Sequence, residues 1–244
     1  RDLAAWERAQ HRMLLGVAWP RAEILLARLA RLPLVQQAQL AGSVRRGVAL
    51  VGDINIVMAS PDPPRLMHLC NQQPEIRQVL ETDATSTVVL TSEGLRVSLV
   101  AVLPAQFVHA WHYYTGSVNH LTALRRMAQR RGLDLSPYGL VQLERGQYLT
   151  VADEDELYAR LQLPPIAPEL REDNGEIEAA EAGRLPTLVT MADIRGDLHV
   201  QSDWGSGAHS LEDLARIGQQ LGYQYVAICD YATAAAADRG ITAA

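Results

Sequence analysis

The sequence predicts an α+β protein followed by the opening of a further α/β domain. Three observations lead to this expectation. Residues 20–31 carry apolar side chains at helical spacing, and extended segments separated by turn-prone residues recur between residues 35 and 101. Residues 196–229 then show a strand, a helix and a strand in that order, which is typical of α/β domains.

The composition is that of a globular protein with an acidic balance. The 244 residues carry a formal net charge of −6, with 48% hydrophobic and 20% charged residues. No apolar run approaches the roughly 20 residues that a membrane span needs, and no signal-peptide pattern opens the chain, so we expect no membrane partner. Cys70 and Cys229 lie far apart without metal-ligand spacing, which favours a reducing, cytoplasmic location.

The 22 basic residues are all arginine. Without a lysine, these residues cannot form a lysine Schiff base, which excludes lyase chemistry of that type here. The acidic net charge argues against a bulk basic surface for nucleic acid. Any nucleic-acid surface must therefore depend on how the arginines are distributed.

The first half of the chain is expected to form a mixed sheet backed by two helices. Pro20 suits the first turn of the helix at 20–31. The run PDPP at 61–64 breaks a strand and opens a short helix. The expected strands are 35–41, 53–59, 77–82, 86–91 and 95–101.

The second half is expected to be helical at first and then to restart as a new domain. The segment 163–186 is rich in proline, glycine and acid, which predicts an interdomain linker. The expected elements are a helix from 104 to about 115, a helix at 118–131, a hairpin at 138–150, an acid-rich helix start at 153, a strand at 196–200, a helix at 210–221 and a strand at 223–229.

Several motifs together resemble one known family. GSVRRG (42–47) and VGDINIV (51–57) resemble the palm motif of family X DNA polymerases. The stretch from HYYTGSVNH to ALRR (112–126) resembles that family's palm-to-thumb crossover, and RGLDLSPYGL (131–140) resembles its thumb. RGDLHVQSDWGSG (195–207) resembles the opening metal motif of a PHP (polymerase and histidinol phosphatase) domain. Their order points to the bacterial PolX branch.

The resemblance implies a polymerase beta-like nucleotidyltransferase palm with a mixed sheet, a small α/β thumb and the start of an α/β PHP barrel. The chain would then be part of a longer protein, since it begins at Arg1 and ends within the PHP-like region. The implied divisions are the end of the fingers at 1–13, the palm at 14–103, the thumb at 104–170, an acidic linker at 171–192 and the incomplete PHP domain at 193–244.

The resemblance also implies a nucleotide site and a DNA surface. Small residues let backbone N–H groups approach phosphate, and arginine adds charge-assisted hydrogen bonds. The implied nucleotide-binding residues are Gly42, Ser43, Arg46, Gly52, Tyr113, Tyr114 and Gly116. Arg125 matches a thumb arginine beside the new base pair, and the helix that carries it also holds Arg126, Arg130 and Arg131, which extend the implied DNA surface.

The palm departs from the family at its catalytic carboxylates. In the family, three aspartates hold two Mg²⁺ ions that activate the primer hydroxyl and neutralise pyrophosphate. Here Asp53 fills the first position, while Asn55 and Ser98 stand at the second and third. Arg96 and Val100 share the strand face of Ser98, so no neighbouring acid replaces it. Mg²⁺ prefers anionic oxygen ligands, so we expect Mg or Mn binding here to be weak or absent.

The PHP-like motif is similarly altered. His199 and Asp230 match metal-binding positions, but Gln201 and Tyr231 stand where the family has histidine. A lone histidine near a strand end is more often a hydrogen-bonded structural residue than a ligand. Divalent metals in this domain are therefore doubtful.

Three functions follow from the resemblance. The chain is a gap-filling repair polymerase with impaired or Mn²⁺-dependent nucleotidyl transfer, a catalytically inactive DNA-binding relative, or the carrier of a PHP 3′–5′ exonuclease or phosphoesterase. All three share gapped or primer-ended DNA as partner, and the first adds a deoxynucleoside triphosphate. Whether the chain is an enzyme depends on the altered carboxylates, and the sequence does not assign its oligomeric state.

Overall fold

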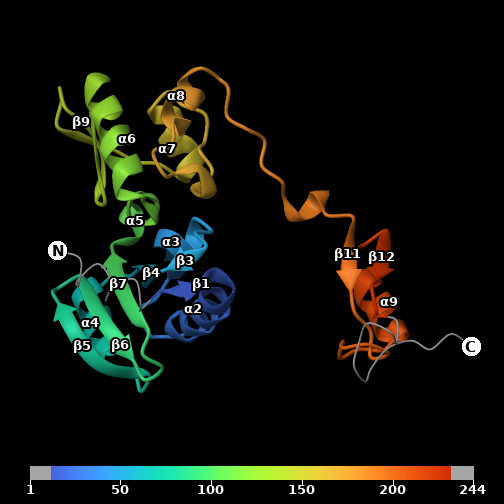
Figure 1. Cartoon of the computed structure of the whole chain (residues 1–244). Coiled ribbons are helices and arrows are strands. Elements are labelled where there is room, and N and C mark those ends of the chain that lie inside the picture. The colour runs from blue at the N-terminus through green and yellow to red at the C-terminus, as the bar shows by residue number, and fades with distance from the viewer. Residues whose placement is uncertain (1–11, 232–244) are drawn as a thin grey trace, which may run out of the picture. The chain divides into compact units, whose positions relative to one another are not determined.

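A computed structural model describes residues 12–231 (Figure 1). The chain divides into two compact units, one ending at Leu185 and one beginning at Pro186. Each unit is described by itself. Within the first unit we call residues 14–103 the palm segment and residues 104–185 the thumb segment, after the resemblance above.

The palm segment is built on a five-stranded mixed sheet with the strand order β2-β4-β7-β6-β5. The central pair β4 and β7 is parallel, and the other neighbours are antiparallel. The strands are β2 (Gln37–Ala41), β4 (Ile54–Ala59), β5 (Ile76–Thr82), β6 (Ser86–Thr91) and β7 (Arg96–Val102). These lie where the sequence placed its strands, and the mixed sheet of an α+β fold is confirmed.

Two helices cover one face of this sheet, as expected. Helices α2 (Leu15–Leu29) and α4 (Pro63–Asn71) pack on the apolar side chains that alternate along β4 and β7. Ile54, Ile56 and Met58 of β4 are all fully buried there. Each such side chain contributes about 1.5–3 kcal/mol on burial, so the alternation fixes which face of the strands turns inward.

Helix α2 begins five residues earlier than the sequence predicted. It starts at Leu15, so Pro20 lies inside the helix rather than in its first turn. Ala18 and Ala22 are fully buried on one helix face with Leu25. The packing of these three buried residues outweighs the preference of proline for the start of a helix. Just before α2, β1 (Met13–Leu14) pairs with β3 (Leu50–Val51).

The opposite face of the sheet is covered by α5 (Phe107–Thr115). Val57, Val100 and Val102 form a second core with Phe107 and Ala110. Asn55 and Ser98 lie on this same face, because side chains two residues apart share a strand face. The glycine-serine turn after β2 forms a single helical turn, α3 (Gly42–Arg45).

After α5, the thumb segment combines three helices with a small antiparallel sheet of order β10-β9-β8. A shared core joins these elements, with Leu124, Leu135, Leu140 and Leu157 fully buried. The elements are α6 (Val118–Arg130), β8 (Leu133–Ser136), β9 (Gly139–Gln142), β10 (Gln147–Leu149), α7 (Glu154–Arg160) and α8 (Glu176–Glu181).

The acidic linker predicted over 171–192 differs from the structure in its first part. Helix α8 belongs to the first unit, because Ile177 and Ala180 are buried in the thumb core. Arg171 is only 2% exposed. Two apolar residues within an acidic stretch are enough to dock a short helix, so the compact thumb segment ends at Leu185 instead of 170.

The second unit contains one β-α-β arrangement in its described part. Strands β11 (Gly196–Val200) and β12 (Tyr225–Ile228) are parallel, and α9 (Leu211–Gln220) connects them. Ser210 accepts a hydrogen bond from the Asp213 backbone N–H and so caps this helix. In residues 12–231, no helix is long and apolar enough to cross a membrane.

Candidate functional site

A cavity of about 370 Å³ lies where the palm segment meets the start of the thumb segment. Its walls come from the turn after β2, from the start of β4 and from the α5–α6 connection. The cavity takes in six of the seven residues that the sequence assigned to nucleotide binding, namely Gly42, Ser43, Arg46, Tyr113, Tyr114 and Gly116. The seventh, Gly52, lines a neighbouring cavity of about 690 Å³, which also borders Asp53.

Two glycines allow the close approaches that shape this cavity. Gly42 has φ +61°, and a Cβ there would lie 2.5 Å from the Asn55 Nδ2 atom. Gly116 has φ +73°, and a Cβ there would lie 3.2 Å from the Arg46 Nη1 atom. Any larger residue at either position would strain the backbone and would displace a side chain that lines the cavity. Glycine at both positions therefore keeps the cavity open.

The three positions that match the family's carboxylates lie together in space. Asn55 of β4 is directly opposite Ser98 of β7 in the parallel register. The Ser98 hydroxyl donates a hydrogen bond of 3.5 Å to Asp53 Oδ2. Asp53 and Asn55 line the cavity, while Ser98 lies beside it through this bond. The structure thus brings the three positions together with a single carboxylate among them.

This donor set does not fit the pair of divalent ions that the resemblance implies. Two such ions need several anionic oxygen ligands, whereas an amide and a hydroxyl supply only neutral oxygens. In residues 12–231, no three His, Cys, Asp or Glu side chains come together as a metal site. Asn55 is also packed against Gly42, which restricts how its amide can turn.

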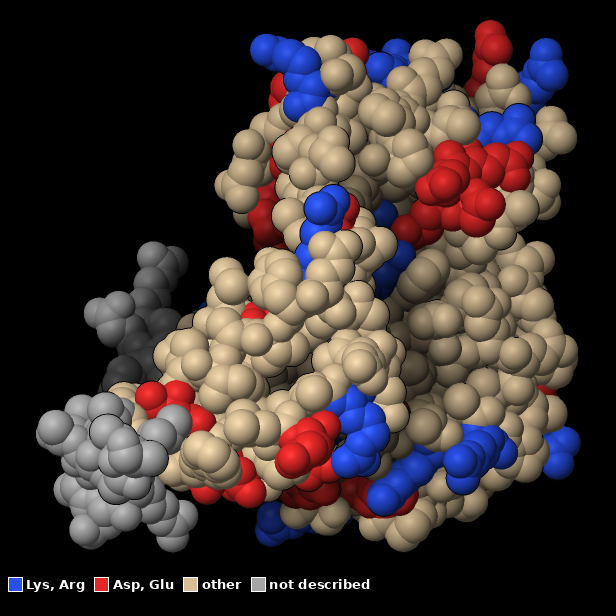
Figure 2. Space-filling model, turned by 90° about the vertical axis from the view of Figure 1, so that its right-hand side faces the viewer, with Lys and Arg blue, Asp and Glu red and all other residues tan. Residues whose placement is uncertain are grey.

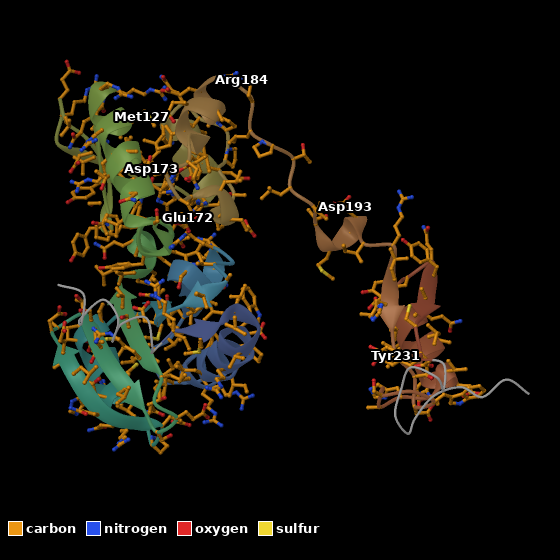
Figure 3. The ribbon with its side chains drawn as sticks, viewed as in Figure 1. Met127, Glu172, Asp173, Arg184, Asp193 and Tyr231 are labelled. Atoms are coloured by element: carbon orange, nitrogen blue, oxygen red, sulfur yellow. The ribbon has the colours of Figure 1, made fainter. Side chains whose placement is uncertain are left out.

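Arg46 is held at the cavity wall from the thumb side. Its Nε donates to Glu172 Oε1 at 2.6 Å, and its Nη1 donates to the carbonyl oxygen of Thr115. Figure 3 shows Glu172 at the end of the thumb segment that faces the palm segment. The Arg46 side chain is 12% exposed. A guanidinium carries five N–H donors, so these two bonds leave donors for an anion in the cavity.

A buried ion cluster behind the cavity joins the two segments. Glu154 of α7 accepts two hydrogen bonds from Arg45, at 2.8 and 2.7 Å, and two from Arg171, at 3.1 and 2.9 Å. The Arg45 guanidinium also stacks over the Trp111 ring at 3.4 Å and donates to Thr115 Oγ1 at 2.8 Å. We call Arg45, Glu154 and Arg171 the clamp.

The clamp stabilises the charged form of Glu154. Burial acts to raise the pKa of Glu154, but the hydrogen bonds from Arg45 and Arg171 outweigh it and lower that pKa to about 2. Glu154 is therefore charged across the physiological range. No local sequence pattern marks these three residues as partners. The only signals were the paired arginines at 45–46 and the RED triplet at 171–173. Their partners lie far away in the sequence, so neither signal identifies the cluster by itself.

The four arginines that the sequence assigned to the DNA surface make different contacts in the structure. Arg125 lines the cavity and donates to Asp134 Oδ1 at 3.3 Å. Arg131 donates to the carbonyls of Leu161 and Gln162 and to Glu181, so it fastens the thumb core. Arg126 and Arg130 are exposed on one side of α6, one helical turn apart. Figure 2 shows basic and acidic groups interspersed on the face in view rather than gathered in one basic band.

The two residues of the second unit that were predicted to bind metal, His199 and Asp230, have different surroundings. His199 is exposed on β11. Asp230 accepts hydrogen bonds from the backbone N–H of Ser202, at 2.9 Å, and from its hydroxyl. Gly205 packs closely on this carboxylate, because a Cβ there would lie 2.6 Å from Asp230 Oδ1. Asp230 thus has a structural role in closing the loop after β11.

Comparison with known proteins gives two matches. Residues 110–172 match the family described as DNA polymerase beta thumb. The chain is also 34% identical over 205 residues to the DNA polymerase/3′-5′ exonuclease PolX of Bacillus subtilis (strain 168). That alignment covers 83% of this chain and 36% of the relative, so the chain spans about a third of the relative's length. Together the two matches support a relationship to the family X DNA polymerases.

Proposed function

We propose that this chain supplies the palm and thumb of a family X polymerase-like DNA repair protein, which binds gapped or primer-ended DNA together with a nucleotide. Nucleotidyl transfer is impaired in this proposal. Residues 14–103 act as the palm, residues 104–185 as the thumb, and the second unit as the start of a PHP domain, in a cytoplasmic protein.

One observation carries the proposal. Segments near residues 42–46, 53–55 and 113–125, far apart in the sequence, line a single cavity. The cavity combines small residues and a hydroxyl at the turn, arginines at two walls and aromatic rings on the crossover. Tyr113 and Tyr114 meet edge to face with their ring centroids 5.5 Å apart. Such a wall suits a sugar and base, while the arginines suit the phosphates.

The chain's own residues can bind and orient a nucleotide but offer little for the transfer step. Divalent ions would activate the primer hydroxyl and neutralise the leaving group. Asp53 alone is a carboxylate, and its Oδ2 already accepts the Ser98 hydroxyl. Binding and positioning are therefore separated from chemistry in this palm. In residues 186–231 no cluster of metal-ligating side chains forms, so the exonuclease alternative has no such observation in its favour.

DNA binding is tested by its salt dependence on a duplex with a one-nucleotide gap. We expect gapped DNA to be preferred over intact duplex in filter binding. Replacing both Arg126 and Arg130 with alanine should reduce the slope of log affinity against log salt by about 0.9 per lost phosphate contact, or roughly 2 in total. Both side chains are exposed on α6, so the fold should be unaffected.

A matched control removes two exposed arginines from the palm segment. Arg65→Ala with Arg77→Ala changes the net charge equally but lies outside the proposed DNA surface. We expect its slope to equal that of the unmodified chain. Equal slopes for the two double variants, or equal affinity for gapped and intact duplex, would contradict the proposed DNA-binding role.

A further inference from the structure

We propose that the cavity binds the triphosphate of a nucleotide without a divalent metal ion. This inference rests on the proposed function, since it concerns the same cavity. It starts from the charges on the cavity wall. Arg46 and Arg125 face a single carboxylate, Asp53, so the formal charge of the lining is positive. A palm with two more carboxylates would be negative there and would need metal ions before it could accept phosphates.

The neutral side chains at positions 55 and 98 carry this difference. Asn55 lines the cavity, and Ser98, which lies beside the cavity, donates a hydrogen bond to Asp53. A carboxylate close to a phosphate repels it even at the dielectric constant of water, and more strongly where water is excluded. Removing two carboxylates therefore removes a repulsion that metal ions would otherwise have to screen.

The arginines also have unused hydrogen-bonding capacity. The Nε atom of Arg125 is buried and has no hydrogen-bond partner within residues 12–231. The donors of Arg125 that a phosphate in the cavity would meet are those on its Nη atoms, because the side chain is 42% exposed and only Nη2 donates to a protein partner, Asp134. Arg46 has donors left beyond its bonds to Glu172 and Thr115. Both walls of the cavity can thus receive an anion.

Glu172 is the group that opposes this binding. Its carboxylate pairs with Arg46 Nε at 2.6 Å, and its side chain is 34% exposed. A triphosphate must share or displace this partner. The metal-free site is therefore limited by one carboxylate of the thumb segment, and its affinity should respond to that residue. Asp134, which pairs with Arg125 at 3.3 Å, acts in the same direction at the other wall.

The test is calorimetric titration with deoxyadenosine triphosphate in EDTA and, separately, in excess Mg²⁺. We expect the unmodified chain to bind in EDTA with an affinity within about fivefold of that in Mg²⁺. Asn55→Asp with Ser98→Asp should weaken binding in EDTA by roughly tenfold or more, and Mg²⁺ should reverse the loss. Inorganic tripolyphosphate should bind in EDTA more weakly than the nucleotide.

A second variant keeps the test valid if the double aspartate variant fails to fold. Glu172→Gln should raise the affinity in EDTA by about fivefold. Glu181→Gln is its matched control, because Glu181 also pairs with an arginine, Arg131, but that arginine does not line the cavity. It should leave the affinity unchanged.

The outcomes separate this inference from the proposed function. Binding that requires Mg²⁺ would overturn the metal-free site while leaving the nucleotide cavity in place. An absence of binding in both buffers would overturn the proposed function itself. Equal affinities for tripolyphosphate and the nucleotide would show a simple anion site and contradict the nucleotide assignment.

Discussion

Replacing Glu154 with glutamine is expected to lower the free energy of unfolding by about 3 kcal/mol, because it leaves two arginines without their anion. The Arg45 and Arg171 side chains are 14% and 2% exposed. Their charges were compensated by four hydrogen bonds to one carboxylate. A neutral amide cannot replace that charge and also brings an N–H donor toward arginine N–H groups. The clamp joins the palm and thumb segments, so both should become less stable.

The same residue predicts a dependence of stability on pH. The folded pKa of Glu154 lies at about 2, below its ordinary value of 4.5. A depressed folded pKa contributes stability above the unfolded pKa, and this contribution is lost as the pH falls through the folded value. We therefore expect the contribution of Glu154 to be complete above about pH 5 and to disappear between about pH 4.5 and pH 2.

Urea denaturation followed by circular dichroism measures both effects. The matched control is Asp155→Asn, which removes a neighbouring carboxylate that is exposed on the same helix. We expect that control to stay within about 0.5 kcal/mol of the unmodified chain. Equal midpoints for the two variants, or a Glu154→Gln variant whose stability falls between pH 5 and pH 3 as steeply as that of the unmodified chain, would contradict the role of the clamp.

Placing carboxylates at positions 55 and 98 is expected to have the largest effect on chemistry. Asn55 and Ser98 are opposite each other in the parallel register, and Ser98 is bonded to Asp53. Asn55→Asp with Ser98→Asp therefore places three carboxylates in one cluster. We expect divalent metal affinity to rise by at least about tenfold, because two anionic oxygen donors are added to one.

Calorimetric titration with Mn²⁺ and gap filling with Mg²⁺ measure the outcome. The titration should show the gain in metal affinity whether or not extension returns. Asn55→Asp alone is the intermediate control, since it adds one carboxylate on β4 next to Asp53 without the partner on β7. A double variant that folds but binds Mn²⁺ no better than the unmodified chain would show that these positions are not an eroded metal site.

The sequence predicted the palm sheet well because its strands alternate strongly. Ile54, Ile56 and Met58 point to one core while Val57 points to the other, which is a period that only a strand satisfies. The helix before it was predicted to start too late. Ala18 is small and carries little periodic signal, yet its full burial draws the helix start back past Pro20.

The parts that the sequence missed depend on contacts between distant residues. Arg171 and Glu154 form the clamp with Arg45, which is more than a hundred residues away, and no local pattern reveals such a partner. The acidic stretch around α8 was read as a linker because charge dominates its composition, although Ile177 docks it on the thumb core. Six of the seven predicted nucleotide residues gather around one cavity, while their roles stay predictions.

The measurement that tests the central claim most directly is single-turnover filling of a one-nucleotide gap by the unmodified chain, in Mg²⁺ and in Mn²⁺. We predict that a nucleotide complementary to the template strengthens the complex with gapped DNA more than a mismatched one does. We also predict that extension is undetectable or very slow in Mg²⁺, with any residual extension confined to Mn²⁺. Rapid extension in Mg²⁺ that persists after Asp53→Ala would contradict both the site and the function proposed for it.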